Sequence, residues 1–253
     1  MLFRQLLKDD TACASYLLGC TTAGELAVVD PHADLVDDYI DGAERHGSSI
    51  KAVLETHVQA DHVSGLPGLV ERTGATAYVP EGAGVEFEHH PLADGELVTL
   101  GNTVVQAVST PGHAAAHHSY LVTDHRRGDA PWMVLTGDAL LVGAAGRPDL
   151  HAHGDSTAEE MAGQLYDSIT GRLLELPDHL LIYPGHYSGS VCGSGLSGHP
   201  ASTVGFERRH NRVLREPREA FVAALLEEIP PAPDDQAAIV AANRDGRRLA
   251  RRA

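Results

Sequence analysis

The chain has 253 residues, 43% of them hydrophobic, and its 35 acidic against 19 basic residues give a formal net charge of −16. This length suits one large domain with a buried core, and no apolar run approaches the roughly 18 residues of a membrane span. An acidic protein gains nothing by displacing counterions from nucleic acids or anionic membranes, so neither is an expected partner.

The first half of the chain alternates strands with helices. Residues 1–10 predict a short strand and lack the long apolar region of a signal peptide, so the expected location is cytoplasmic. Strands are expected at 16–19, 26–31 and 50–54, with a helix over 34–46 from its apolar spacing. A second helix is expected over 63–74, and Pro67 indicates that its regular part begins late.

The second half begins with a run of short strands. They are expected at 76–79, 96–100, 103–108, 119–123 and 132–135. His89 and His90, before Pro91, are interpreted as a surface turn. A helix over 157–176, a strand at 180–183 and helices after Ala201 and Glu216 complete the order. Two sheets packed face to face, with helices outside, are the predicted α/β arrangement.

The C-terminal segment is treated separately from residues 1–215. Within 216–253, the prolines of 230–233 separate two amphipathic stretches, and residues 247–252 are basic. We expect a helical extension packed on the same domain, and docking to a partner chain is the alternative.

A cluster of metal-ligand residues follows the strand at 50–54. His57, Asp61 and His62 stand at the spacing of an H-x-H-x-D-H loop, but Gln59 occupies the position of the middle histidine. Imidazole and carboxylate groups are ligands of zinc and iron. The loop therefore predicts a metal site in which one expected ligand is missing.

Three further ligand candidates come directly after predicted strands. They are His113 in Thr-Pro-Gly-His, Asp138 in Thr-Gly-Asp, and His186 in Tyr-Pro-Gly-His. Loops at strand ends can converge on one site. His117 and His118 alternate across a strand, so at most one of them is expected to face that site. Cys13 and Cys20 are interpreted as buried, small apolar side chains.

These motifs resemble the metallo-β-lactamase superfamily over residues 1–215. Within it, Thr-Gly-Asp-Ala-Leu-Leu at 136–141, followed by Gly-Arg-Pro-Asp at 146–149, resembles the persulfide dioxygenases, a branch related to glyoxalase II. The resemblance implies a four-layer αββα sandwich, with two mixed β-sheets flanked by helices. Residues 202–209 resemble bacterial members that often carry a rhodanese domain, so a separate rhodanese-type sulfurtransferase is a candidate partner.

The resemblance also assigns the ligands. In dizinc hydrolases of this fold, one metal takes both histidines of the H-x-H pair, and Gln59 removes one of them. His57, His113 and Asp138 remain, the two-histidine, one-carboxylate set of non-haem Fe(II) oxygenases. One Fe(II) per chain is therefore expected, with zinc as the alternative. Asp61, His62 and His186 become groups around this site or ligands of a second metal.

The implied reaction oxidises a low-molecular-weight thiol persulfide, such as glutathione persulfide, with O₂ to sulfite and free thiol. Arg147 is the candidate for binding a substrate carboxylate, because its planar guanidinium suits bidentate pairing; a salt bridge with Asp149 or Asp155 is the alternative. Cys192, in a Gly-rich loop after His186, is a candidate sulfur carrier or gate. The alanines at 114–116, where the family usually has small polar residues, leave the carrier thiol open.

Two other functions compete with the dioxygenase. A dizinc thioesterase of the glyoxalase II kind would hydrolyse an acyl-thiol, and Gln59 argues against it. A non-catalytic sulfur-carrier or interaction module would use Cys192 and the basic end of the chain. A homodimer is expected from the family resemblance alone.

Overall fold

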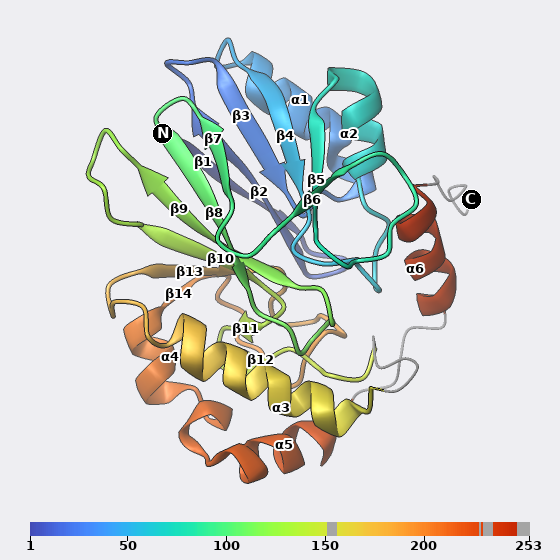
Figure 1. Cartoon of the computed structure of the whole chain (residues 1–253), viewed down its shortest axis with the longest axis vertical. Helices are drawn as coiled ribbons and strands as arrows, with labels where there is room; N and C mark the ends of the chain where they lie inside the picture. Colours follow the sequence, from blue (N-terminus) through green and yellow to red (C-terminus); the bar gives the residue numbers. More distant parts are fainter. Residues whose placement is uncertain (151–155, 228, 230–234, 247–253) are drawn as a thin grey trace.

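Two six-stranded β-sheets pack face to face, with helices on both outer sides (Figure 1). The structure is a computed structural model that describes residues 1–150, 156–227, 229 and 235–246. The four-layer αββα arrangement predicted from the sequence is confirmed. Asp155 and the basic end of the chain, residues 247–252, lie outside the described residues.

The first sheet contains the N-terminal strands in sequence order. The β1, β2 and β3 strands are antiparallel, whereas β3 to β6 run parallel. Its strands are β1 (Leu2–Lys8), β2 (Cys13–Cys20), β3 (Glu25–Val29), β4 (Ser49–Leu54), β5 (Thr76–Pro80) and β6 (His90–Leu92).

The second sheet has the order β14-β13-β10-β9-β8-β7 and is also mixed, because β10 and β13 are parallel. Its strands are β7 (Leu97–Leu100), β8 (Thr103–Ser109), β9 (His118–Asp124), β10 (Met133–Gly137), β13 (Leu181–Pro184) and β14 (Ser202–Thr203). A two-stranded ribbon follows β10, formed by β11 (Leu140–Leu141) and β12 (Ala144–Ala145).

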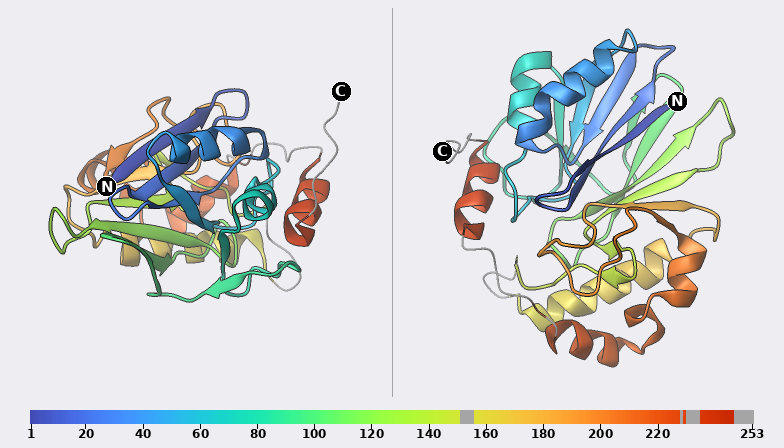
Figure 2. Two further views of the ribbon diagram at one scale, coloured as in Figure 1. Left: turned by 90° about the horizontal axis from the view of Figure 1, so that it is seen from above. Right: turned by 180° about the vertical axis from the view of Figure 1, so that it is seen from behind.

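The helices cover the outer faces of the two sheets (Figure 2). The first sheet is covered by α1 (Val36–Glu44) and α2 (Leu66–Thr73). The second is covered by α3 (Ala158–Ser168), α4 (Val204–His210) and α5 (Arg218–Glu227). The last helix, α6 (Gln236–Asp245), lies apart from α5 on the side of α2 (Figures 1 and 2). The division of the chain at residue 215 stays a prediction.

Strand β2 contributes side chains to two hydrophobic cores, one on each face of the first sheet. All eight of its residues are buried. Tyr16 and Leu18 point into the core between the sheets, whereas Leu17 packs in the core under α1 and α2. Successive side chains of a strand point to opposite faces, so a strand covered on both sides needs an uninterrupted apolar run. Each fully buried leucine contributes about 1.5–3 kcal/mol.

Most predicted elements are confirmed, including the late start of α2, which has Pro67 in its first turn. The surface turn expected around His90 is wrong, because His90 begins β6 and pairs with Tyr78. Pro91 fits there because β6 is an edge strand of the first sheet, where a missing N–H costs no ladder bond. The helix expected over 157–176 is regular only to Ser168 and continues as a π-helical turn, Ile169–Leu173.

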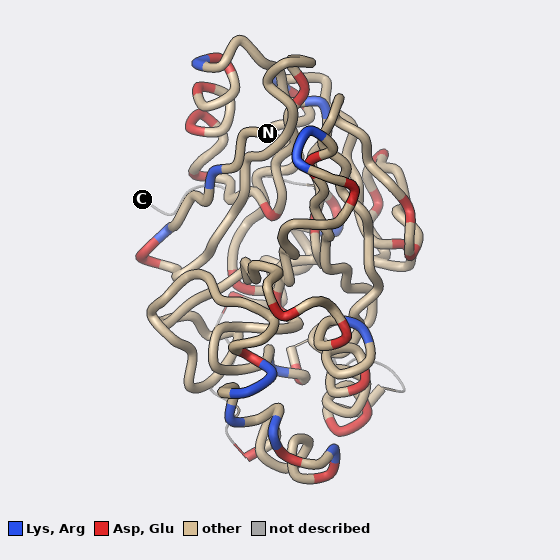
Figure 3. The backbone as a smooth tube through the Cα atoms, turned by 90° about the vertical axis from the view of Figure 1, so that its left-hand side faces the viewer, with Lys and Arg blue, Asp and Glu red and all other residues tan. Residues whose placement is uncertain are grey.

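Acidic positions are spread over both halves of the fold, with basic positions interspersed (Figure 3). In the described part of the chain, no helix combines the length and the apolar character that a membrane crossing requires.

Candidate metal centre

The predicted ligands follow strands of both sheets and meet at one end of the sandwich. His57 lies three residues after β4 in the first sheet. In the second sheet, His113 follows β8, Asp138 follows β10 directly, and His186 lies two residues after β13. Because each strand is fixed by pairing and packing, the loops present their ligands from a rigid frame.

His57, His113 and Asp138 form a fully buried group, with their ligand atoms within 4.8 Å of one another. The Asp138 Oδ2 atom lies 3.5 Å from His113 Nε2 and 4.0 Å from His57 Nε2. Bonds of about 2.1 Å to one shared ion place two ligand atoms about 3.0–4.2 Å apart. The donor set and its spacing therefore fit a divalent metal ion, with two imidazoles and one carboxylate.

Neighbouring groups orient each of these three side chains. The His57 Nδ1–H donates to Thr56 Oγ1 at 3.0 Å, and Thr56 in turn donates to Asp30. The His113 Nδ1–H donates to the carbonyl oxygen of Arg147 at 2.8 Å. Both bonds leave Nε2 as the atom that faces Asp138. Such partners fix the tautomer and ring orientation that a metal ligand needs.

The protonation states also suit metal binding. Burial lowers the pKa of His113 below its ordinary value, so its imidazole stays neutral and able to coordinate. Burial alone would raise the pKa of Asp138, but the charge and hydrogen bond of His186, with a smaller contribution from His113, outweigh it, and the pKa of Asp138 lies below its ordinary value. Metal ligands must be deprotonated to bind, and both groups meet this condition.

Gln59 directs its amide at a buried carboxylate. Its side chain is 2% exposed, and Nε2 donates to Asp30 Oδ1 at 3.3 Å. The same Asp30 oxygen accepts the backbone N–H of Thr56 at 2.7 Å. Asp30 has a positive φ of 49°, a conformation that is uncommon outside glycine. The residue that replaces the missing histidine thus belongs to the hydrogen-bond network of Asp30 and Thr56, which also supports His57.

A second group lies beside the first and contains Cys13 together with the three remaining predicted ligands. Its members, whose ligand atoms lie within 4.8 Å of one another, are Cys13, Asp61, His62 and His186. His186 links the two groups, because Nδ1 donates to Asp138 Oδ1 at 2.7 Å while Nε2 contacts Asp61 Oδ2 at 2.8 Å. The structure therefore brings all six predicted ligands together.

Cys13 was not expected at the site. Its Sγ atom lies 3.6 Å from His62 Nδ1 and 3.6 Å from Asp61 Oδ2. The first residue of β2 reaches this position because Cys13 bridges to His186, and the N–H of Ala14 donates to the carbonyl of Gly185 at 2.7 Å. That pairing joins segments more than 170 residues apart, so no local pattern could have indicated it.

The two substrate-binding candidates differ in their surroundings. Arg147 is buried, and its Nε and Nη2 atoms each donate to a carboxylate oxygen of Asp149 at 2.8 Å. This is the salt bridge that was the alternative interpretation, so substrate binding by Arg147 stays a prediction. Cys192 is buried, with its thiol in a group with Asp138 and His186. The Gly-rich loop therefore does bring this thiol to the ligands.

Of the two adjacent histidines on β9 and its approach, His117 contacts the site. Its Nε2 accepts the backbone N–H of Asp138 at 3.2 Å, and Nδ1 contacts Thr110 Oγ1 at 2.9 Å. His118 lies near Asp94 and Arg172 instead. His117 therefore holds the backbone of Asp138 from behind.

The fold agrees with comparisons to known proteins. Residues 9–186 match the family model described as the metallo-beta-lactamase superfamily, and the chain belongs to this superfamily. It is 27% identical over 227 residues to the mitochondrial persulfide dioxygenase ETHE1 of Bos taurus, with 89% of this chain and 80% of the relative covered.

Similar proteins include both of the predicted classes of enzyme. The crystal structure of ETHE1 from Myxococcus xanthus superposes with a TM-score of 0.83 at 33% identity, covering 96% of this chain and 98% of that one. A hydroxyacylglutathione hydrolase of Methylobacillus flagellatus is 29% identical over 224 residues, covering 87% of this chain and 78% of the relative. The superfamily alone therefore does not select the reaction.

Proposed function

We propose that this chain is a non-haem Fe(II) persulfide dioxygenase. In the proposed reaction, a thiol persulfide, O₂ and water give the free thiol, sulfite and two protons. One iron per chain would be held by His57, His113 and Asp138. Bound Fe(II) would supply open coordination positions and the redox capacity that none of these side chains has.

The position of Gln59 is the observation that carries this proposal. A dizinc hydrolase needs a second imidazole from the H-x-H pair, and the amide that stands there donates to Asp30. Two histidines and one carboxylate remain in the first group. The similarity to two proteins named ETHE1 supports the same reaction.

The chain's own residues would orient the reactants and keep out water. The three ligands are at most 1% exposed, which strengthens electrostatic interactions within the site. Cys192 and, if Asp149 releases it, Arg147 are the proposed contacts of the persulfide and its carrier. Glutathione is the proposed carrier. A homodimer, a rhodanese-type partner and a cytoplasmic location stay predictions.

A hydroxyacylglutathione-type hydrolase is the second candidate, because Asp61, His62 and His186 are all present and close together. Two well-held zinc ions and a metal-bound hydroxide would be needed for that reaction.

Oxygen consumption tests the proposal. Protein loaded anaerobically with Fe(II) is expected to consume O₂ when given glutathione persulfide and to form one sulfite for each O₂. His113→Ala is expected to abolish both. Absence of O₂ uptake in an iron-loaded wild type, with rapid hydrolysis of hydroxyacylglutathione by the zinc-loaded form, would replace the dioxygenase with the hydrolase.

A further inference from the structure

The loop that carries three of the predicted ligands has little backbone structure of its own. We call residues 55–65, between β4 and α2, the metal loop; it contains His57, Asp61 and His62. Within the described part of the chain, the backbone of residues 58–62 makes no hydrogen bond to other backbone groups. Contacts with side chains are therefore needed to fix the shape of residues 58–62.

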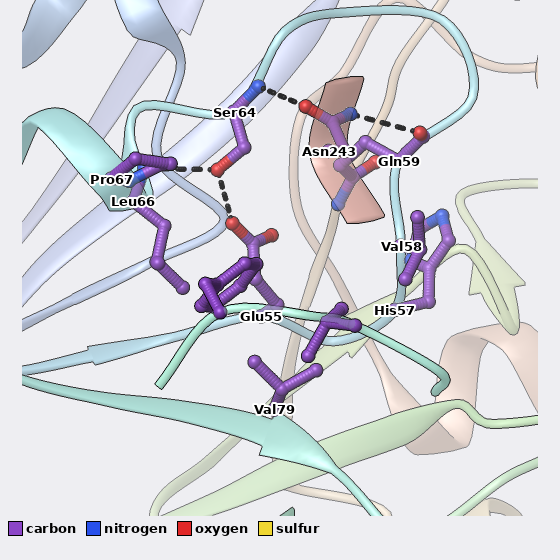
Figure 4. Close-up of a pocket in the computed structure, with 11 residues that line it drawn as sticks. Glu55, His57, Val58, Gln59, Ser64, Leu66, Pro67, Val79 and Asn243 are labelled. Carbon is purple, nitrogen blue, oxygen red and sulfur yellow. Dashed lines mark hydrogen bonds between the residues drawn. The ribbon is translucent and has the colours of Figure 1, made fainter. Parts of the chain in front are cut away.

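Asn243, on α6, makes three such hydrogen bonds with the metal loop. Its Nδ2 atom donates to the carbonyl of Gln59 at 3.0 Å and to the carbonyl of His62 at 2.9 Å. Its Oδ1 atom accepts the N–H of Ser64 at 2.9 Å. Figure 4 shows the Asn243 amide between Gln59 and Ser64. One buried amide thus uses both donors and its acceptor on the metal loop.

The surrounding contacts press the same helix against the loop. Val240 packs with Val58 and Ala60 in one buried apolar cluster. Beyond Asn243, the carbonyl of Arg244 accepts the N–H of Glu86 at 2.8 Å. A small pocket lies between the metal loop, β5 and α6, and Asn243 contributes to its lining (Figure 4).

The residue type at position 243 is a further indication. Asparagine is a poorer helix former than the alanines around it, yet it stands in the last turn of α6 and is 8% exposed. A buried amide is costly unless its hydrogen bonds are made. Here all of its hydrogen-bond partners are backbone groups of the metal loop. Asparagine therefore lowers the intrinsic stability of α6 but forms a long-range contact that alanine could not make.

We infer that α6 is a positioning element of the metal centre and acts through Asn243. The amide holds the carbonyls of Gln59 and His62, and through them the segment that presents His57, Asp61 and His62. Metal binding and docking of α6 are then coupled, and the coupling acts in both directions. This inference rests on the proposed metal centre but not on which reaction the centre performs.

Metal affinity of the full chain tests the inference, with zinc as a redox-inert probe in competition with a chelator. Asn243→Ala is expected to weaken zinc binding by about 10–100-fold, the usual effect of losing a partner that orients metal ligands. Asn243→Asp keeps the size of the side chain and its acceptor but removes both donors, so a similar loss is expected. Gln236→Ala is the matched control, because Gln236 lies on the same helix and donates to the carbonyl of Leu150 instead.

Hydrogen exchange provides a readout that a purely structural role would not move. In wild type, zinc is expected to slow amide exchange in residues 236–246, and in Asn243→Ala it is not, while exchange in α5 responds to zinc in neither protein. Wild-type affinity in both Asn243 variants, or unchanged α6 exchange on loading the wild type, would overturn the inference alone. A wild type that binds neither zinc nor iron would overturn the proposed metal centre and this inference with it.

Discussion

The Gln59 amide donates to the Asp30 carboxylate at 3.3 Å, at the position where the H-x-H motif would carry a second imidazole. Asp30 also accepts from the backbone and hydroxyl of Thr56, whose oxygen receives the Nδ1–H of His57. Gln59 is therefore part of the network that supports a metal ligand, and we do not expect its amide to coordinate the metal.

Replacing Gln59 by alanine tests this assignment. Gln59→Ala is expected to bind iron as wild type does, whereas His57→Ala loses it. The free energy of unfolding should fall by about 1 kcal/mol, because one buried hydrogen bond is lost. Metal analysis and urea unfolding measure the two effects. Loss of iron in Gln59→Ala comparable to that in His57→Ala would make Gln59 a ligand.

Gly146 lies so close to Asp138 and His113 that a side chain at this position would collide with them. A Cβ atom added there would lie 1.9 Å from the carbonyl oxygen of Asp138 and 3.0 Å from His113 Nδ1. Gly146→Ala is expected to displace both ligands, to abolish iron binding and to lower the free energy of unfolding by about 1–3 kcal/mol. Gly171→Ala is the control, because a Cβ there meets no atom within 4 Å. An iron-replete Gly146→Ala would show that the loop can shift without harm.

A buried pair of acids should make the metal-free protein less stable as the pH rises. Burial raises the pKa of Asp30 from 3.8 to about 6, and burial together with the charge of Asp30 raises that of Glu55 well above its ordinary value. Because the pKa of Asp30 is higher in the folded protein than in the unfolded chain, its contribution to the free energy of unfolding is complete below pH 3.8. That contribution is lost as the pH rises through about 6.

Urea unfolding at pH 5 and pH 8 measures this dependence. Between these values the metal-free wild type is expected to lose on the order of 2 kcal/mol through this pair. Glu55→Gln should lose less, because it removes one titrating acid while its side-chain oxygen can still accept from Ser64. Equal losses in the two proteins would mean that the Asp30–Glu55 pair does not titrate in this range.

Cys192 offers a test of the proposed persulfide contact. Its thiol lies beside Asp138 and His186, so Cys192→Ser is expected to lower kcat/KM with glutathione persulfide by about tenfold, equivalent to about 1.4 kcal/mol. Cys20→Ser is the matched control. Cys20 is also buried, but it lies at the end of β2 opposite Cys13 and belongs to none of the groups of candidate ligands. Equal turnover in the two variants would remove Cys192 from the proposed site.

The fold and the clustering of the candidate ligands could be predicted because both follow from local sequence patterns. His57, His113, Asp138 and His186 each follow an apolar run that predicts a strand, and glycine or proline lies in most of the connecting turns. Cys13 and Asn243 could not be predicted in the same way. Cys13 reaches His186 through a bridge between distant strand ends, and Asn243 reaches Gln59 across 184 positions. Such contacts depend on the register of the sheets and the path of the C-terminal segment.

Arg147 shows a different limit. Its place in the motif suited either a substrate carboxylate or a salt bridge within the loop, and Asp149, two residues later, accepts from its Nε and Nη2 atoms in a bidentate pair. The carboxylate of Asp149 and a carboxylate of a substrate would pair with the guanidinium in the same way. The sequence does not choose between them, and the folded loop places Asp149 within hydrogen-bond distance.

Dividing one metal-free preparation between Fe(II) and Zn(II) tests the central claim most directly. Each half is assayed with glutathione persulfide, for O₂ consumption and sulfite, and with hydroxyacylglutathione, for hydrolysis. We expect one iron per chain, equal amounts of O₂ consumed and sulfite formed by the iron half, and little hydrolysis by either half. Two zinc ions per chain with rapid thioester hydrolysis, and no O₂ uptake by the iron half, would contradict the proposed dioxygenase.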